Sequence, residues 1–136
     1  MKYVDASAVL RILFNEPGLA VPLTGSDRVV SSQLIEVETF RAVDRERLLG
    51  NLSDTVTAIK RKELGDLLTM LDLARIDDVV IAGARSSFAV PVRALDAIHV
   101  ATAEMLAAEG GVLEFWTHDP RQATAALSRG LTVRGI

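Results

Sequence analysis

Short apolar runs alternate with longer amphipathic stretches along the whole chain of 136 residues. The apolar runs end at polar or turn-forming residues and predict strands at 3–4, 28–30, 73–76, 112–116 and 131–134. Apolar positions three and four residues apart predict helices at 8–14, 33–49, 53–71, 79–88, 93–109 and 121–129, with one further helical turn at 19–23. Because strands and helices alternate from end to end, we expect an α/β fold with a mostly parallel sheet of about four or five short strands flanked by helices.

The predicted helix 93–109 is apolar on nearly every side, which is typical of a helix in the interior of a soluble protein. It carries Asp96 in its first turn, where a charge is costly to bury without a partner or a cation. One turn further on, positions 99 and 100 hold neither lysine nor arginine. Asp96 is therefore either a functional residue or a side chain that caps the helix or complements its dipole.

Three more acids occur where the predicted topology brings them near Asp96. Asp5 and Asp119 each follow an apolar strand and precede a helix, and Glu38 lies on the apolar side of a helix that begins at the same edge of the sheet. Ligands of open α/β sheets bind at the carboxyl ends of the strands. Unit charges about 4 Å apart repel by roughly 4 kcal/mol at an effective dielectric constant of 20, so such a cluster of carboxylates requires a counter-charge.

Each of these acids also has a purely structural interpretation. Asp5 and Asp119 are of a type that commonly caps helices, and an Asp-Pro pair is a common turn. Glu38 shares its arc of the helix with Arg41 and Arg45, a spacing that forms Glu–Arg pairs worth a few tenths of a kcal/mol. We favour the functional interpretation because all four acids are expected at one edge of the sheet. The structural interpretation would need a separate explanation for each of them.

Carboxylate ligands without thiolates indicate Mg²⁺ or Mn²⁺ rather than zinc. The chain has no cysteine, and its two histidines, His99 and His118, show no paired metal-ligand spacing. His99 lies one turn after Asp96, where it either orients that carboxylate or packs as a structural residue. A divalent ion held by carboxylates activates a water molecule and polarises a phosphate, so hydrolysis of a phosphodiester bond is the expected reaction.

Composition limits the partners and the compartment. The net charge of −3 and the isoelectric point near 5.3 argue against binding of nucleic acid through overall charge. Nucleic acid could still bind at one site, if metal ions neutralise the acids there. The amino terminus lacks the apolar core of a signal peptide and no apolar run approaches a membrane span, so we expect one cytoplasmic domain over residues 1–136 without a membrane partner. The mean hydropathy of +0.28 suggests that a partner or a second copy covers some apolar surface.

Four segments carry a more specific signal, namely YVDASAV at 3–9, Ser32 with Glu38 and Arg41, LDAIHVATA at 95–103, and THD at 117–119. Together they resemble PIN-domain proteins, and more closely the VapC toxins of bacterial toxin–antitoxin pairs. The resemblance covers the whole chain in order. It implies a three-layer PIN fold over residues 1–136 and an endoribonuclease that depends on Mg²⁺ or Mn²⁺.

The matching motifs also imply a role for each polar residue. The catalytic and metal-binding acids would be Asp5, Glu38, Asp96 and Asp119, and the supporting polar residues would be Ser7 and Thr117. Asp119 is followed by Pro120, which is a variation on the family's pattern. The implied partners are RNA, a cognate VapB-type antitoxin, and a second copy in a homodimer or a toxin–antitoxin hetero-oligomer.

We expect the antitoxin to dock on the amphipathic helices 32–49 and 53–71, which flank Glu38, and to place a guanidinium among the acids. Two other functions remain open: a non-catalytic PIN module that binds a partner protein or RNA, and a PIN nuclease outside toxin–antitoxin systems. A phosphoacceptor domain needs a lysine near its last strand, and a phosphatase of the haloacid dehalogenase type needs an aspartate where Ser7 stands. The sequence shows neither residue.

Overall fold

The computed structural model describes residues 1–111 and 113–136, and within them five strands form one sheet in the order β3-β2-β1-β4-β5. All four neighbouring pairs are parallel. The strands are β1 (Lys2–Val4), β2 (Val29–Ser32), β3 (Asp72–Ala74), β4 (Glu114–Trp116) and β5 (Thr132–Arg134). The predicted parallel sheet is therefore confirmed, although Val112, in the predicted strand 112–116, lies outside the described residues.

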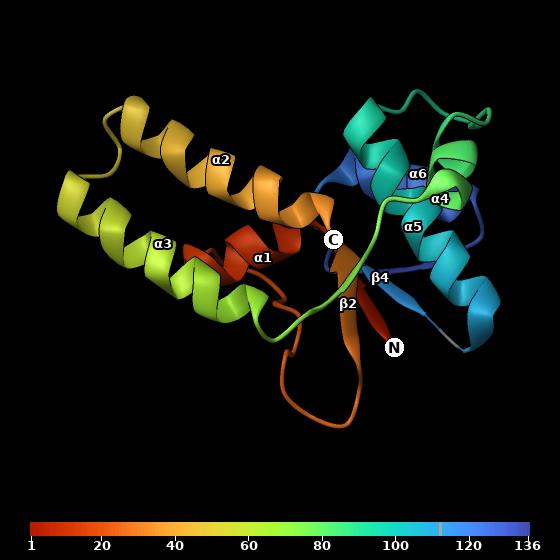
Figure 1. Ribbon diagram of the computed structural model, residues 1–136, viewed down its shortest axis with the longest axis horizontal. Coiled ribbons are helices and arrows are strands. Elements are labelled where there is room, and N and C mark those ends of the chain that lie inside the picture. Colours follow the sequence, from red (N-terminus) through yellow and green to blue (C-terminus); the bar gives the residue numbers. More distant parts are fainter. Residues whose placement is uncertain (112) are drawn as a thin grey trace.

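Helices cover both faces of this sheet, as the α/β pattern predicts (Figure 1). They are α1 (Ala6–Leu13), α2 (Leu34–Leu48), α3 (Asp54–Leu68), α4 (Asp78–Ala84), α5 (Ala94–Gly110) and α6 (Pro120–Ser128). Adjacent residues of one strand point to opposite faces, so Val4 packs in a core with α1, α2 and α3, whereas Tyr3 packs in a second core with α5 and α6. The three-layer arrangement follows from this alternation.

The long helices α2 and α3 form a hairpin that extends beyond the sheet (Figure 1). The turn between them begins at Gly50, whose φ of +79° lies in the left-handed region that favours glycine, just after the last helical residues. Ser53 then starts α3, because its side chain accepts a hydrogen bond from the Val56 backbone N–H. The hairpin leaves large apolar side chains exposed, among them Leu48 and Leu49.

The strand order places a switch point between β1 and β4. The chain adds β2 and β3 on one side of β1, then crosses back and places β4 and β5 on the other side. Helices that leave neighbouring strands in opposite directions open a crevice at the carboxyl ends of those strands. Residues that follow Val4 and Trp116 therefore lie in the position where α/β proteins bind ligands.

Two local predictions are wrong. Residues 19–23, predicted as a helical turn, contain neither helix nor strand. Pro22 disfavours helical geometry at Val21, which is instead buried against the α1 layer, and the Pro22 carbonyl accepts a hydrogen bond from the Lys2 side chain. The helix predicted at 79–88 ends at Ala84, because the Ser86 hydroxyl bonds the Gly83 carbonyl and the Ser87 carbonyl accepts from Arg129 on the loop after α6.

None of the helices in the described ranges is both long and apolar enough to cross a lipid bilayer.

Candidate active site

Asp5 lies directly after β1 and is almost fully buried, with 1% of its surface exposed. It is the N-cap of α1, and its Oδ1 accepts hydrogen bonds from the Ala8 backbone N–H at 2.9 Å and from Ser7 Oγ at 2.7 Å. Its Oδ2 accepts from Thr117 Oγ1 at 2.5 Å. A carboxylate oxygen has two acceptor positions, so one position on Oδ2 remains for a ligand.

Ser7 and Thr117 join the ends of β1 and β4 into one polar network. Ser7 Oγ accepts from the His118 backbone N–H at 2.7 Å, and Thr117 Oγ1 accepts from the Asp119 backbone N–H at 3.0 Å. The two hydroxyls lie 3.3 Å apart. Each hydroxyl donates to Asp5 while it accepts from the backbone N–H of His118 or Asp119.

Burial raises the pKa of Asp5 above its ordinary value, because a charge is disfavoured away from water. The hydrogen bonds from Thr117, Ser7 and Ala8 and the proximity of His99 act in the opposite direction and do not fully offset burial. A carboxylate in this state gains more from a bound cation than an exposed one would, since the cation compensates for the lost hydration.

Asp96 is half-buried in the first turn of α5, and its pKa is also raised. Burial is the main cause, and the negative charges of Asp119 and Glu38 add to it, while Arg93 and His99 lower the pKa in part. No donor in the described part of the chain bonds the Asp96 carboxylate, and the N-cap of α5 is Arg93, so Asp96 does not cap its helix. Two of the other expected acids, Asp119 and Glu38, therefore lie close enough to Asp96 for their charges to act on it.

Asp119 is half-buried and is the N-cap of α6, where its Oδ1 accepts from the Arg121 backbone N–H at 2.8 Å. The Arg121 side chain lies nearby, with Nε 3.8 Å from the same oxygen. Pro120 occupies the first helical position, where a missing N–H costs nothing. The capping interpretation thus holds for both Asp5 and Asp119, because Oδ1 of each accepts a hydrogen bond from the first turn of its helix.

Glu38 does not form the Glu–Arg pair that its spacing allows. Its Oε2 lies 2.6 Å from Nε2 of His99, whereas Arg41 pairs with Asp44 at 3.1 Å. His99 is 1% exposed, and its Nδ1 lies 2.7 Å from the Tyr3 hydroxyl. Sequence reasoning placed His99 beside Asp96 or in the core and missed its contact with Glu38, because the two residues are 61 positions apart.

The donor set fits a hard divalent cation in its chemistry, since it offers carboxylate oxygens and a rigid buried Asp5. In the side-chain arrangement of the described residues, no three acidic or histidine groups are close enough to hold an ion together. The His118 ring donates from Nδ1 to the Gly135 carbonyl and belongs to the carboxyl-terminal segment instead. Among the described residues, Asp5, Asp96, Asp119 and Glu38 therefore offer carboxylate oxygens near the switch point without forming a closed set of ligands.

Two cavities adjoin this rim. One of about 260 Å³ is lined by Asp96 together with Arg93, Arg121, Pro91 and Val92. A second, of about 420 Å³, shares Pro91 and Arg121 with the first and continues along Val90, Pro120 and Thr124. The guanidinium groups of Arg93 and Arg121 thus line the same cavity as the half-buried Asp96 carboxylate, and the second cavity beside it is mainly apolar.

Comparison with known proteins assigns the fold and family. The family model described as "PIN domain" matches residues 2–127. This chain belongs to the PIN domain family. It is 34% identical over 134 residues to "Ribonuclease VapC46" of Mycobacterium tuberculosis, covering 96% of this chain and 94% of that protein. The crystal structure of PAE2754 from Pyrobaculum aerophilum has a TM-score of 0.67 and 19% identity, covering 97% of this chain and 82% of that one, and it supports the PIN fold.

Proposed function

We propose that this protein is an endoribonuclease of the VapC type that depends on Mg²⁺ or Mn²⁺ and acts as the toxin of a toxin–antitoxin pair. The observation that carries the proposal is that the charges of Asp119 and Glu38 act on the half-buried Asp96 at the edge of the sheet where the buried Asp5 follows β1. Such repulsion is costly unless a cation is bound. The similarity to a protein named a ribonuclease supports the choice of RNA as substrate.

Asp5, Glu38, Asp96 and Asp119 would hold the divalent ion. When bound, that ion supplies a water molecule of lowered pKa and polarises the scissile phosphate. Asp5 gives the site a fixed point, because Thr117, Ser7 and the Ala8 N–H hold both of its oxygens. Asp96 accepts no such bonds within residues 1–111 and 113–136 and would adjust to the ligand.

Arg93 and Arg121 would bind the phosphates on either side of the cleaved bond. Both line the cavity that contains Asp96, and the Arg121 side chain is 59% exposed. A guanidinium group recognises phosphate through two parallel hydrogen bonds. These two side chains would offer cationic groups to the phosphates of RNA, although the whole chain carries a net charge of −3.

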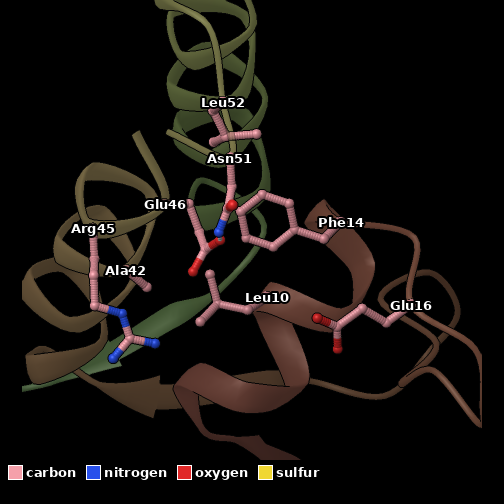
Figure 2. A pocket seen from close by; sticks show the side chains of 8 residues that line it. All are labelled: Leu10, Phe14, Glu16, Ala42, Arg45, Glu46, Asn51 and Leu52. Atoms are coloured by element: carbon pink, nitrogen blue, oxygen red, sulfur yellow. Dashed lines mark hydrogen bonds between the residues drawn. The ribbon is translucent and has the colours of Figure 1, made fainter. Parts of the chain in front are cut away.

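The antitoxin would occupy a pocket between α1 and the α2–α3 hairpin (Figure 2). This pocket of about 410 Å³ has Leu10, Phe14 and Leu52 as its apolar wall, and its other lining residues are Glu16, Ala42, Arg45, Glu46 and Asn51. Ala42 lies one helical turn from Glu38 on α2, a rise of about 6 Å, so a chain seated in the pocket can reach the acidic rim. An apolar side chain in the pocket and a guanidinium at the rim would block both RNA and metal.

The nuclease is tested by incubating the purified protein with total RNA in Mg²⁺, in Mn²⁺ and in EDTA. We expect cleavage with metal only, and none from Asp5→Asn. Undiminished cleavage in EDTA would contradict the dependence on metal. A complete absence of cleavage under all conditions would favour the non-catalytic PIN module.

The toxin assignment is tested separately by expressing the protein alone and with the product of the adjacent upstream reading frame. We expect growth arrest from the lone protein, relief by its neighbour, and no arrest from Asp5→Ala. Cleavage in vitro without growth arrest or complex formation would instead indicate a PIN nuclease outside toxin–antitoxin systems.

A further inference from the structure

Tyr3, His99 and Glu38 form a continuous row of hydrogen bonds from the sheet to the acidic rim. The Tyr3 hydroxyl lies 2.7 Å from Nδ1 of His99, and Nε2 of the same ring lies 2.6 Å from Oε2 of Glu38. Tyr3 and His99 are completely or almost completely buried, and the Glu38 side chain is 18% exposed. The row thus connects β1, α5 and α2, which belong to different layers of the fold.

Packing fixes both rings of this row. Tyr3 stacks on Phe115 with ring centroids 5.1 Å apart and meets His99 edge to face at 5.9 Å. Aromatic rings in such contacts keep a defined orientation. Because the rings cannot turn freely, the Nε2 atom of His99 is aimed at one place on α2.

The hydrogen bonds at the Tyr3 oxygen indicate where its proton goes. This oxygen accepts from the Ser32 backbone N–H at 3.1 Å. The neighbouring hydroxyls of Ser31 and Thr102 donate to backbone carbonyl groups instead. Neither of those hydroxyls donates to the Tyr3 oxygen, and we assign the proton of the Tyr3 hydroxyl to its contact with Nδ1 of His99 at 2.7 Å.

A neutral imidazole that accepts at Nδ1 carries its proton on Nε2. His99 then donates that proton to Oε2 of Glu38, and Oε1 of Glu38 remains for another partner. This bond is the one that holds the Glu38 side chain, which is 18% exposed, among the described residues.

We propose that His99 is a positioning residue, held by Tyr3 as the Nε2–H tautomer, which fixes Oε2 of Glu38 and leaves Oε1 to a divalent cation. The proposal rests on the proposed metal-dependent function. Hydrogen-bond donors behind a metal ligand orient it, and their loss typically weakens metal affinity by about 10- to 100-fold.

The test compares two substitutions of His99 that keep different nitrogens. The amide of His99→Gln reaches the position of Nε2 and can donate to Glu38, whereas the shorter His99→Asn keeps only a partner for Tyr3. Binding of Mn²⁺ is measured by calorimetry, and thermal unfolding in EDTA reports whether each variant folds. We expect His99→Asn to lose about 10- to 100-fold in Mn²⁺ affinity and His99→Gln to stay within a few-fold of the wild type.

A double-mutant cycle separates positioning from a general effect on the fold. In a Glu38→Ala background, His99→Asn should cause no further loss of Mn²⁺ affinity. The proposal fails if a folded His99→Asn variant binds Mn²⁺ as tightly as the wild type, if His99→Gln and His99→Asn lose affinity equally, or if the loss persists without Glu38.

Nitrogen-15 NMR of the metal-free wild type provides a test that needs no variant, and so does not depend on whether the variants fold. We expect the imidazole shifts of His99 to show a bare Nδ1 and a protonated Nε2. A proton on Nδ1 would overturn the assignment. RNA cleavage is measured in parallel. If the protein shows the Nε2–H tautomer and His99-dependent Mn²⁺ binding but cleaves no RNA, the proposed nuclease activity is refuted and the positioning role of His99 is retained.

Discussion

Asp5 and Asp96 are two carboxylates at one rim, and the pKa of both is raised, but they are held in opposite ways. Asp5 is buried and accepts three hydrogen bonds from Ser7, Ala8 and Thr117. Asp96 is half-buried, accepts none within the described residues, and faces the like charges of Asp119 and Glu38. The hydrogen bonds of Asp5 tie it into the fold, whereas Asp96 makes no such bond within the described residues, and we expect its charge to destabilise the metal-free protein.

The largest expected effect is shared by the two residues. Asp5→Asn and Asp96→Asn should each lower the rate of RNA cleavage by at least about 100-fold, because each removes charge from the centre where the reaction takes place. The measurement is cleavage of total RNA under saturating Mn²⁺. The matched control is Asp66→Asn, an exposed acid that pairs with Lys62 on α3, which should cleave like the wild type. Normal cleavage by Asp96→Asn would remove that residue from the proposed centre.

The network around Asp5 should contribute to stability independently of metal. Thr117→Val preserves shape, but it removes a donor to Asp5 and leaves the Asp119 N–H without its acceptor, so we expect a loss of about 1–3 kcal/mol of unfolding free energy. Denaturant unfolding in EDTA measures it. The control is Thr124→Val, whose exposed hydroxyl bonds only a backbone carbonyl of its own helix. Equal stability of the two variants would contradict the distinction drawn between Asp5 and Asp96.

Substitution of Asp96 should raise the unfolding free energy of the metal-free protein, in contrast to substitution of Thr117. In EDTA at neutral pH, Asp96→Asn should be more stable than the wild type by about 1 kcal/mol, the size of a like-charge contact about 4 Å apart in a watery environment. Its raised pKa means that the folded protein binds a proton more tightly than the unfolded chain does. The stabilisation from that proton is complete below the unfolded pKa of about 3.9 and is lost as pH rises through the folded pKa.

The advantage of Asp96→Asn should therefore be small near pH 4 and grow as the pH rises to 7. Thermal unfolding of both proteins across this range in EDTA measures the difference. Adding Mn²⁺ should reverse it, because the ion stabilises only the protein that binds it, by about 2.7 kcal/mol at one hundred times the dissociation constant. A mutant that unfolds at lower temperature than the wild type in EDTA would show that Asp96 stabilises the fold.

The smallest effect concerns the arginines beside Asp96. Arg93→Gln and Arg121→Gln should each raise the KM for RNA about fivefold, corresponding to about 1 kcal/mol for a largely exposed charge pair, and leave kcat nearly unchanged. Steady-state cleavage kinetics at two salt concentrations measure this. The control is Lys62→Gln, on the exposed side of α3. A change in kcat alone would place these side chains in the reaction rather than in substrate binding.

Much of this site could be predicted from local sequence. Asp5 and Asp119 stand between a strand and a helix, and a cap is determined by residues within three positions of it, as the bonds to Ala8 and Arg121 confirm. The parallel sheet followed from alternating patterns, and the edge at which the acids gather followed from the parallel sheet. The failed helical turn at 19–23 was a local error too, because Pro22 was visible in the sequence.

The sequence by itself determined which acids follow strands or open helices, and hence the edge of the sheet at which they lie. Only the tertiary structure decided that Glu38 pairs with His99 rather than with Arg41 or Arg45, and that Asp96 accepts no hydrogen bond from the part of the chain that is described. The physical reason is the separation in sequence between the residues that interact. Caps and periodic faces depend on neighbours in the chain, whereas the contacts of His99 join residues 61 and 96 positions away, which become neighbours only when α5 packs across the sheet.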